Sequence, residues 1–380
     1  MKRILTFLGT ILVMAGSTAW AQEVNSSAPM SQPSFGEDEI AQQVVDYTPA
    51  ISIDSRFGYD RVVSGGPAGF GGDGVYLNID GKIGKHFSYS LCQRFFSAHG
   101  EDDSAFDNTD WLTLSYEVGQ FAFTAGKDCL VFGSYENDAY DIDSYFDMNS
   151  MFYNSFSSYL WGVKAEWAPS ESSSIALQVT NSPFAYYPKE DDLYAYNIAW
   201  YGEWDCYSSI WSANMFEYEP GKFVKCLALG NMFYVGDLTL GLDCIMRGAD
   251  FKRIGKDEIT VNFMPSYDFG ESFRLFGKLG WERTGAELPY DFWGEYLSAE
   301  DMALANEENI YTLPAFLTVG EDYWFYGAGL EYFPLKENKS IRLHAAWASN
   351  NYTKRHSVNV GLTWKFDIVG AIKHIVGRNK

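Results

Sequence analysis

The sequence lacks the features of a helical membrane protein, a nucleic-acid-binding protein or a disulfide-stapled domain. After residue 21 it has no apolar run of about 18 residues, the length that a transmembrane helix needs. It carries 28 Lys and Arg against 50 Asp and Glu, and its formal net charge of −22 argues against nucleic acid as a partner. Its five cysteines form no C-x-x-C pair, so neither a disulfide framework nor a metal site is predicted.

Recognisable catalytic motifs are missing as well. The five histidines show no H-E-x-x-H pattern and no arrangement typical of a Ser-His pair. The glycine pairs Gly65-Gly66 and Gly71-Gly72 are not followed by the Lys-Ser/Thr of a phosphate-binding loop. The sequence therefore predicts a protein that is not an enzyme and needs no cofactor.

The N-terminus has the pattern of an export signal. Lys2 and Arg3 precede an apolar run over residues 4–16, and Ala19-Trp20-Ala21 fits a cleavage site. We therefore expect residues 1–21 to be a signal peptide. The polar residues 22–47 are expected to form a lead-in segment in the periplasm.

About sixteen strand-like runs fill residues 48–366. Apolar and polar residues alternate along them, as where Leu240 and Leu242 flank Gly241. Long and short connections also alternate, and the first long one is a Gly-rich stretch over residues 58–73. Short turns on one side of a membrane and long loops on the other are typical of an up-and-down barrel. We therefore predict an all-β fold, a transmembrane antiparallel up-and-down β-barrel of about 16 strands.

The last strand-like run, Ser357 to Phe366, closes this pattern. It places Gly361, Trp364 and Phe366 where bacterial outer-membrane barrels carry their closing signal. With the export signal and the long loop after the fifth strand, this ending resembles the Gram-negative outer-membrane porins. Residues 120–127 resemble the strand before the inward-folded loop of the phosphate-selective porin O/P superfamily. The resemblance implies an outer-membrane location, contact with membrane lipids and the barrel-assembly machinery, and a homotrimer as one option.

The C-terminus departs from porins that end at the final Phe. Fourteen further residues, 367–380, follow it and are expected to form a periplasmic extension. Ile368, Ile372 and Ile375 have the spacing of one helix face, so a short helix is one expectation and a frayed basic tail is the other.

The alternation also predicts the side chains that face the lumen. Charged side chains on these strands must face water, because a bare cation at the bilayer midplane costs about 2–4 kcal/mol. The predicted basic wall consists of Arg56, Arg94, Lys164, Arg274, Lys278, Arg342 and Lys365. By the porin resemblance, loop 128–155 folds inward as the constriction, and its acids would face this wall. These acids are Glu136, Asp138, Asp141, Asp143 and Asp147.

The function predicted from these features is a porin, a water-filled channel for the diffusion of small hydrophilic solutes and ions. A sugar- or anion-selective channel is an alternative. A track of loop aromatics could guide sugar rings, and its candidates are Tyr135, Tyr140, Tyr145, Phe146, Phe152 and Tyr153. The excess of acids over bases argues against phosphate selectivity. Alternatives of another class are a structural or adhesive outer-membrane barrel and an outer-membrane hydrolase.

Overall fold

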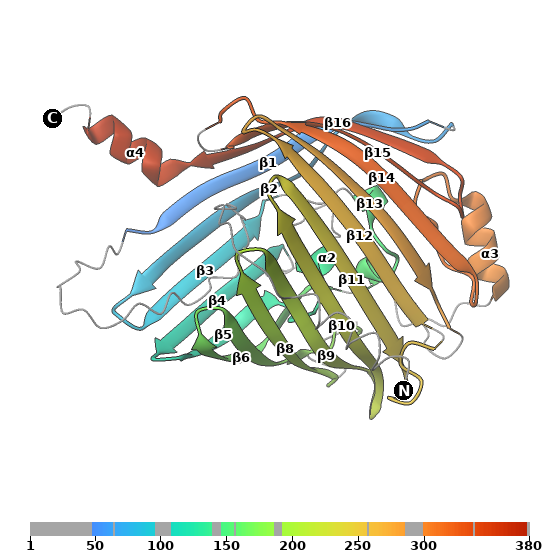
Figure 1. Cartoon of the computed structure of the whole chain (residues 1–380), viewed down its shortest axis with the longest axis horizontal. Coiled ribbons are helices and arrows are strands. Elements are labelled where there is room, and N and C mark those ends of the chain that lie inside the picture. The colour runs from blue at the N-terminus through green and yellow to red at the C-terminus, as the bar shows by residue number, and fades with distance from the viewer. Residues whose placement is uncertain are drawn as a thin grey trace.

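The computed structural model describes residues 48–63, 65–95, 108–138, 146–155, 157–185, 192–256, 258–285, 299–336 and 339–377. The sixteen strands found there pair antiparallel in chain order, and β1 pairs with β16, so the sheet closes into a barrel (Figure 1). The strands are β1 (Ala50–Val62), β2 (Ala68–Ile83), β3 (Phe87–Arg94), β4 (Thr109–Val118), β5 (Phe121–Cys129), β6 (Tyr159–Ser170), β7 (Ser173–Asn181), β8 (Tyr194–Trp204), β9 (Tyr207–Glu219), β10 (Lys222–Val235), β11 (Leu238–Gly248), β12 (Glu258–Phe269), β13 (Phe273–Arg283), β14 (Asp322–Tyr332), β15 (Ile341–Asn350) and β16 (His356–Asp367). The predicted fold class and strand number are confirmed.

The few helical elements lie in connections and at the chain end. The α-helices are α2 (Tyr135–Asp138), α3 (Ala299–Glu308) and α4 (Ile368–Gly377), and the short 3-10 helices are η2 (Phe146–Met148) and η3 (Tyr153–Ser155). Among the residues that the structure describes, no helix has the length and the apolar character to cross a membrane.

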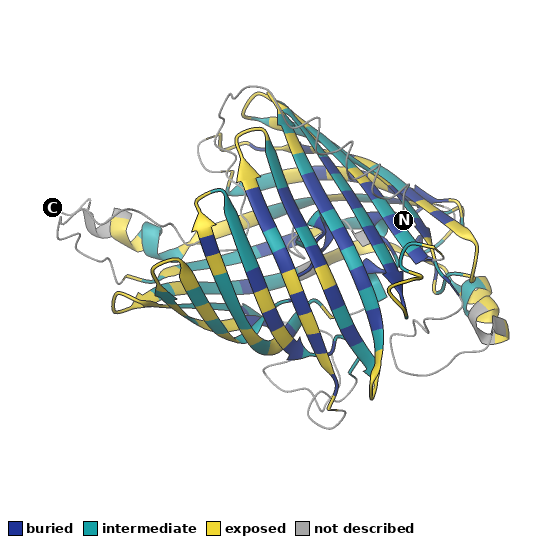
Figure 2. Ribbon diagram, turned by 60° about the horizontal axis from the view of Figure 1, so that its bottom comes forward, coloured by how far each residue is buried: buried dark blue, intermediate teal, exposed yellow. Residues whose placement is uncertain are grey.

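Each strand separates an apolar outer face from a more polar or small-residue inner face. On β8, Tyr194, Tyr196 and Ile198 are exposed on the outside, whereas Ala195 and Asn197 are buried on the inside. Figure 2 shows this alternation of exposed and buried residues across the sheet. Exposure of so many apolar side chains to water would be unfavourable. Contact with lipid is favourable for them, and lipid surrounds a transmembrane barrel.

Tight turns join the strands at one end of the barrel. Gly119 and Gly236 occupy the left-handed region in two of these turns, with φ of 56° and 59°. A residue with a side chain is disfavoured in that region, so glycine permits the two-residue reversal. The other end carries the longer connections, including the one that contains α3 (Figure 1).

The first connection is shorter than the sequence pattern predicts. Residues 58–73 were expected to form a long loop, but β1 continues to Val62 and β2 begins at Ala68. In this stretch Gly71 pairs with Gly58, and Phe70 pairs with Tyr59. Glycines in a strand carry no side chains to alternate, so the pattern could not reveal the pairing.

Candidate functional site

A segment between β5 and β6 runs inside the barrel. We call its described residues, 130–138 and 146–155, the inward segment. The Val131 amide donates to Gln178 Oε1 at 2.8 Å, and Asn214 Nδ2 donates to the Val131 carbonyl at 2.7 Å. The Gly133 amide donates to Ser212 Oγ at 2.7 Å. Gln178, Ser212 and Asn214 are buried on the inner face of β7 and β9, so the segment lies against the interior wall.

Small residues let the segment approach that wall closely. A Cβ atom on Gly133 would lie 2.6 Å from both the Ala228 carbonyl oxygen and the Ser212 amide nitrogen. Ala228 itself has no exposed surface. Beside this contact, Phe132 and Phe152 pack with Phe216 in an apolar cluster inside the barrel. Burial of this apolar surface, added to the hydrogen bonds, favours the inward position over an exposed one.

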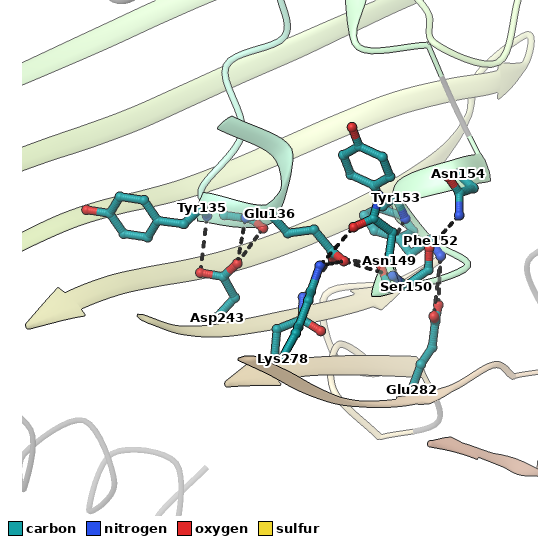
Figure 3. A network of polar contacts seen from close by, with 12 residues as sticks. Tyr135, Glu136, Asn149, Ser150, Phe152, Tyr153, Asn154, Asp243, Lys278 and Glu282 are labelled. Carbon is teal, nitrogen blue, oxygen red and sulfur yellow. Dashed lines mark hydrogen bonds and ion pairs between the residues drawn. The ribbon is translucent and has the colours of Figure 1, made fainter. Parts of the chain in front are cut away.

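The start of α2 is bound by an acid from the wall. Asp243 accepts hydrogen bonds from Ser134 Oγ at 2.8 Å, the Glu136 amide at 3.0 Å and the Tyr135 amide at 3.2 Å (Figure 3). Unpaired amides at a helix start favour an acidic partner. Asp243 on β11 therefore fixes the place where the segment turns.

Glu136 anchors the segment rather than facing open lumen. Its carboxylate accepts from Lys278 Nζ at 2.7 Å and from Asn262 Nδ2 at 2.7 Å. It also accepts from the Ser150 amide at 2.8 Å and from Ser150 Oγ at 2.7 Å (Figure 3). Glu136 is only 3% exposed. The sequence placed it among the charges that ions would meet. The structure instead uses its charge to join two parts of the segment to the wall.

A second anchor involves an arginine that the sequence analysis missed. Glu282 accepts from the Met151 amide at 2.8 Å and the Phe152 amide at 3.1 Å, and Arg247 Nη2 lies 3.3 Å from its carboxylate. The Arg247 guanidinium is fully buried and lies 4.2 Å from the centre of the Phe152 ring. Arg247 lies four residues after Asp243 on β11, and residues an even number apart on a strand share a face. The alternation could therefore have predicted that Arg247 points inward.

The predicted basic residues face inward, but the structure pairs them mainly with acids of the wall. Lys278 is the predicted base with a contact to a loop acid, and it pairs with the buried Glu136. The other predicted bases have these inner-wall partners: Arg94 with Asp110, Lys164 with Asp128, Arg274 with Asp268 and Glu331, Arg342 with Glu331, Lys365 with Asp54, and Arg56 with the Thr363 hydroxyl. These pairs reduce the net positive charge that the wall presents.

Two predicted loop acids are half-buried inside the barrel. Burial raises the pKa of Asp138 to about 6. Burial also raises the pKa of Asp147, against a hydrogen bond from Ser357 that lowers it, and the nearby Asp60 carboxylate raises it further. Asp141 and Asp143 lie outside the described residues.

Open space remains beside the tip of the segment. A cavity of about 450 Å³ lies between η2 and the wall made by β1, β15 and β16. Its polar lining includes Arg56, Asp60, Asp147, Ser357 and Asn359. The same lining includes apolar side chains, among them Val62, Met148 and Trp347, so charged and neutral polar groups lie beside apolar surface in this cavity.

The loop aromatics are occupied by packing. Phe152 is 2% and Tyr153 is 8% exposed, and the Tyr135 hydroxyl bonds to Ser208 Oγ at 2.6 Å. These three rings therefore form no open aromatic path of the kind a sugar channel would use. Among the residues described, no group of three or more side chains is arranged to hold a metal ion.

Comparisons with known proteins bear on the fold. No family model and no curated protein matches the chain. Solved structures do match, and they include a mutant porin from Rhodopseudomonas blastica with 13% identity, a TM-score of 0.53, and coverage of 84% of this chain and 100% of that one. Another is a loop-deletion mutant of OmpT, an outer membrane protein of Vibrio cholerae, with 10% identity, a TM-score of 0.56, and coverage of 84% and 99%. At these identities the likeness is one of fold, and a porin-like barrel with an apolar outer face indicates an outer-membrane location.

Proposed function

We propose that this chain is an outer-membrane porin that lets small hydrophilic solutes and ions diffuse through a water-filled channel. The observation that carries the proposal is the inward segment, which hydrogen bonds hold against the inner face of the barrel at Val131 and at Phe152. Barrels of sixteen strands are wide enough for an aqueous channel. A segment fixed inside that space would narrow the channel.

The anchors make the constriction rigid. Asp243, Glu136 and Glu282 each bind several groups of the segment or the wall, and the last two are also paired with Lys278 and the buried Arg247. Charge-assisted hydrogen bonds are stronger than neutral ones, and several acting together fix one position of the segment. A fixed position is what a size limit requires, because a mobile segment would admit solutes of varying size.

The ion selectivity of the channel depends on the charged groups that are not balanced by an ion pair. The wall bases are balanced by acids, while Asp138 and Asp147 on the segment remain half-buried carboxylates. We therefore propose weak preference for cations. This balance does not favour the phosphate selectivity that the O/P superfamily resemblance would suggest, because phosphate binding requires dense unpaired Arg or Lys.

An adhesive or structural barrel is the competing function. Such a barrel would gain nothing from a segment anchored inside its lumen, whereas a channel gains its size limit. A hydrolase would need a nucleophile beside a base, and His344 on the inner wall instead hydrogen-bonds to Asn359.

Solute uptake into vesicles tests the proposal. We expect liposomes containing the full protein to swell in isotonic solutions of small sugars and amino acids, with a rate that falls steeply as the solute grows. A variant with residues 134–150 replaced by a short Gly-Ser linker should admit larger solutes. A matched control replaces α3 (Ala299–Glu308) in the same way and should keep the wild-type size limit. Absence of swelling with folded protein would refute the channel.

A further inference from the structure

The chain does not end at the barrel seam. Helix α4 (Ile368–Gly377) follows β16 directly, and the Asp367 carboxylate accepts a hydrogen bond from the Gly370 amide at 2.9 Å. This bond caps the start of the helix. Asp367 also pairs with Ser52 of β1 across the seam. The start of α4 is therefore fixed at the barrel rim.

That rim lies at the level of the membrane surface. Trp364 and Phe366, just before the helix, point outward from the barrel and are 37% and 49% exposed. Aromatic side chains at the ends of lipid-facing strands mark the membrane–water interface. Figure 1 shows α4 projecting from the barrel at the end away from α3. The tight turns lie at the same end of the barrel as α4. Because short turns mark the periplasmic side of such barrels, α4 lies on that side.

The composition of α4 does not suit water. Ile368, Val369, Ala371 and Ile372 follow one another with only Gly370 between them, and Ile372 is 55% exposed. The sequence adds Ile375 and Val376 to this apolar set. A ten-residue helix is about 15 Å long, so it is too short to cross a bilayer of about 30 Å but suited to lie along its surface.

The charge of the chain end opposes that of the whole protein. The formal net charge is −22, yet no Asp or Glu follows Asp367, whereas Lys373, Arg378 and Lys380 do. A short apolar stretch with basic residues beside it is typical of helices that bind anionic membrane surfaces. This local excess of basic residues over acidic ones is attracted to anionic lipid.

We propose that α4 lies in the headgroup region of the periplasmic leaflet and binds anionic phospholipid, with Ile368 and Ile372 in the acyl boundary and Lys373 on the headgroups. The proposal rests on the membrane location of the barrel and not on the channel. In this position α4 extends the lipid contact of β16 beyond the closing seam and holds the end of that strand at the membrane surface.

Amide hydrogen exchange of the full protein in vesicles tests the proposal. We compare phosphatidylcholine vesicles with vesicles that also contain phosphatidylglycerol. Because each basic side chain near an anionic surface adds a several-fold gain in attraction, we expect about tenfold slower exchange in α4 when the anionic lipid is present. Added salt should reduce this difference. The exchange of α3 should not depend on lipid charge.

Two variants complete the design. The triple substitution K373Q, R378Q and K380Q should abolish the dependence on anionic lipid, whereas K252Q with K256Q, two exposed bases in the connection between β11 and β12, should leave it intact. Equal exchange of wild-type α4 in both vesicles would overturn the proposal. Slowing that follows protein density rather than lipid charge would also overturn it, because a second copy of the chain would then cover the helix.

Discussion

At the scale of single residues, the interior of the barrel is organised by pairs of opposite charge. Glu136 and Lys278 form such a pair at 2.7 Å, with 0% and 11% of their side chains exposed. The alternation along β13 predicted that Lys278 faces inward, and the sequence named Glu136 as a loop acid. Their meeting depends on the path of the segment through the lumen, which has no periodic pattern and so could not be read from the sequence.

Breaking this pair should release the segment. In E136Q, Lys278 loses its carboxylate partner and keeps only the hydrogen bond to Asn149 Oδ1, so we expect a cost below the roughly 3–5 kcal/mol of breaking a fully buried pair. We expect faster hydrogen exchange and proteolysis within residues 130–155 and a larger, noisier single-channel conductance. The double variant E136Q/K278Q removes the lone charge and should recover part of the wild-type behaviour. If E136Q matched wild type in both measurements, Glu136 would not be an anchor.

Ionisation of Asp138 should make selectivity depend on pH. An Asp side chain ordinarily has a pKa near 4, but burial raises the pKa of Asp138 to about 6. The carboxylate is therefore charged above pH 6 and neutral below it. We expect cation preference, measured by reversal potential, to fall as pH decreases from about 7 to about 5. D138N should start from the lower preference and show a smaller change. An equal change in D138N would assign the titration to other groups.

At the scale of elements, the alternation of apolar and polar residues predicted the strands well. It could not predict the pairing of glycine-rich stretches or the path of the loop inside the barrel. The sixteen runs correspond to the sixteen strands because a barrel in lipid imposes a regular difference between its two faces. The stretch from Gly69 to Gly72 was assigned to a loop although it belongs to β2, because glycine has no side chain that could indicate an inner or outer face. The wall residues that hydrogen-bond to the inward segment are Gln178, Ser212 and Asn214. In the sequence they cannot be distinguished from other inward-facing polar residues, because the position of the segment is not known there.

The closing strand offers a test of assembly. Trp364 and Phe366 lie on the outer face of β16, where they contribute little to the lumen. We expect W364A/F366A to lower the amount of folded barrel in the outer membrane several-fold and to leave unfolded protein in the periplasm, measured by fractionation and heat-modifiable gel mobility. L343A on the outer face of β15 serves as a control for lost lipid contact. Normal membrane levels of the double variant would contradict an assembly role.

At the scale of the whole molecule, the acidic charge is divided between the lumen and the outer loops. We expect only the acids of the inward segment to act on passing ions, because exposed charges are screened within about 8–10 Å at physiological salt. The porin resemblance predicts that this loop is the constriction, and the structure places its described residues inside the barrel. The structure adds that Glu136 belongs to the anchors and should be left intact in any test of selectivity.

The most direct measurement is the reversal potential of single channels in a KCl gradient across a planar bilayer. One variant neutralises four acids of the inward connection, D138N, D141N, D143N and D147N, of which Asp141 and Asp143 lie outside the described residues. The matched variant neutralises four acids of α3, E300Q, D301N, E307Q and E308Q. We expect the first to shift selectivity toward anions and the second to change it little. Equal shifts would contradict the account, because the acidic mouth of the barrel would then set selectivity instead of the inward segment.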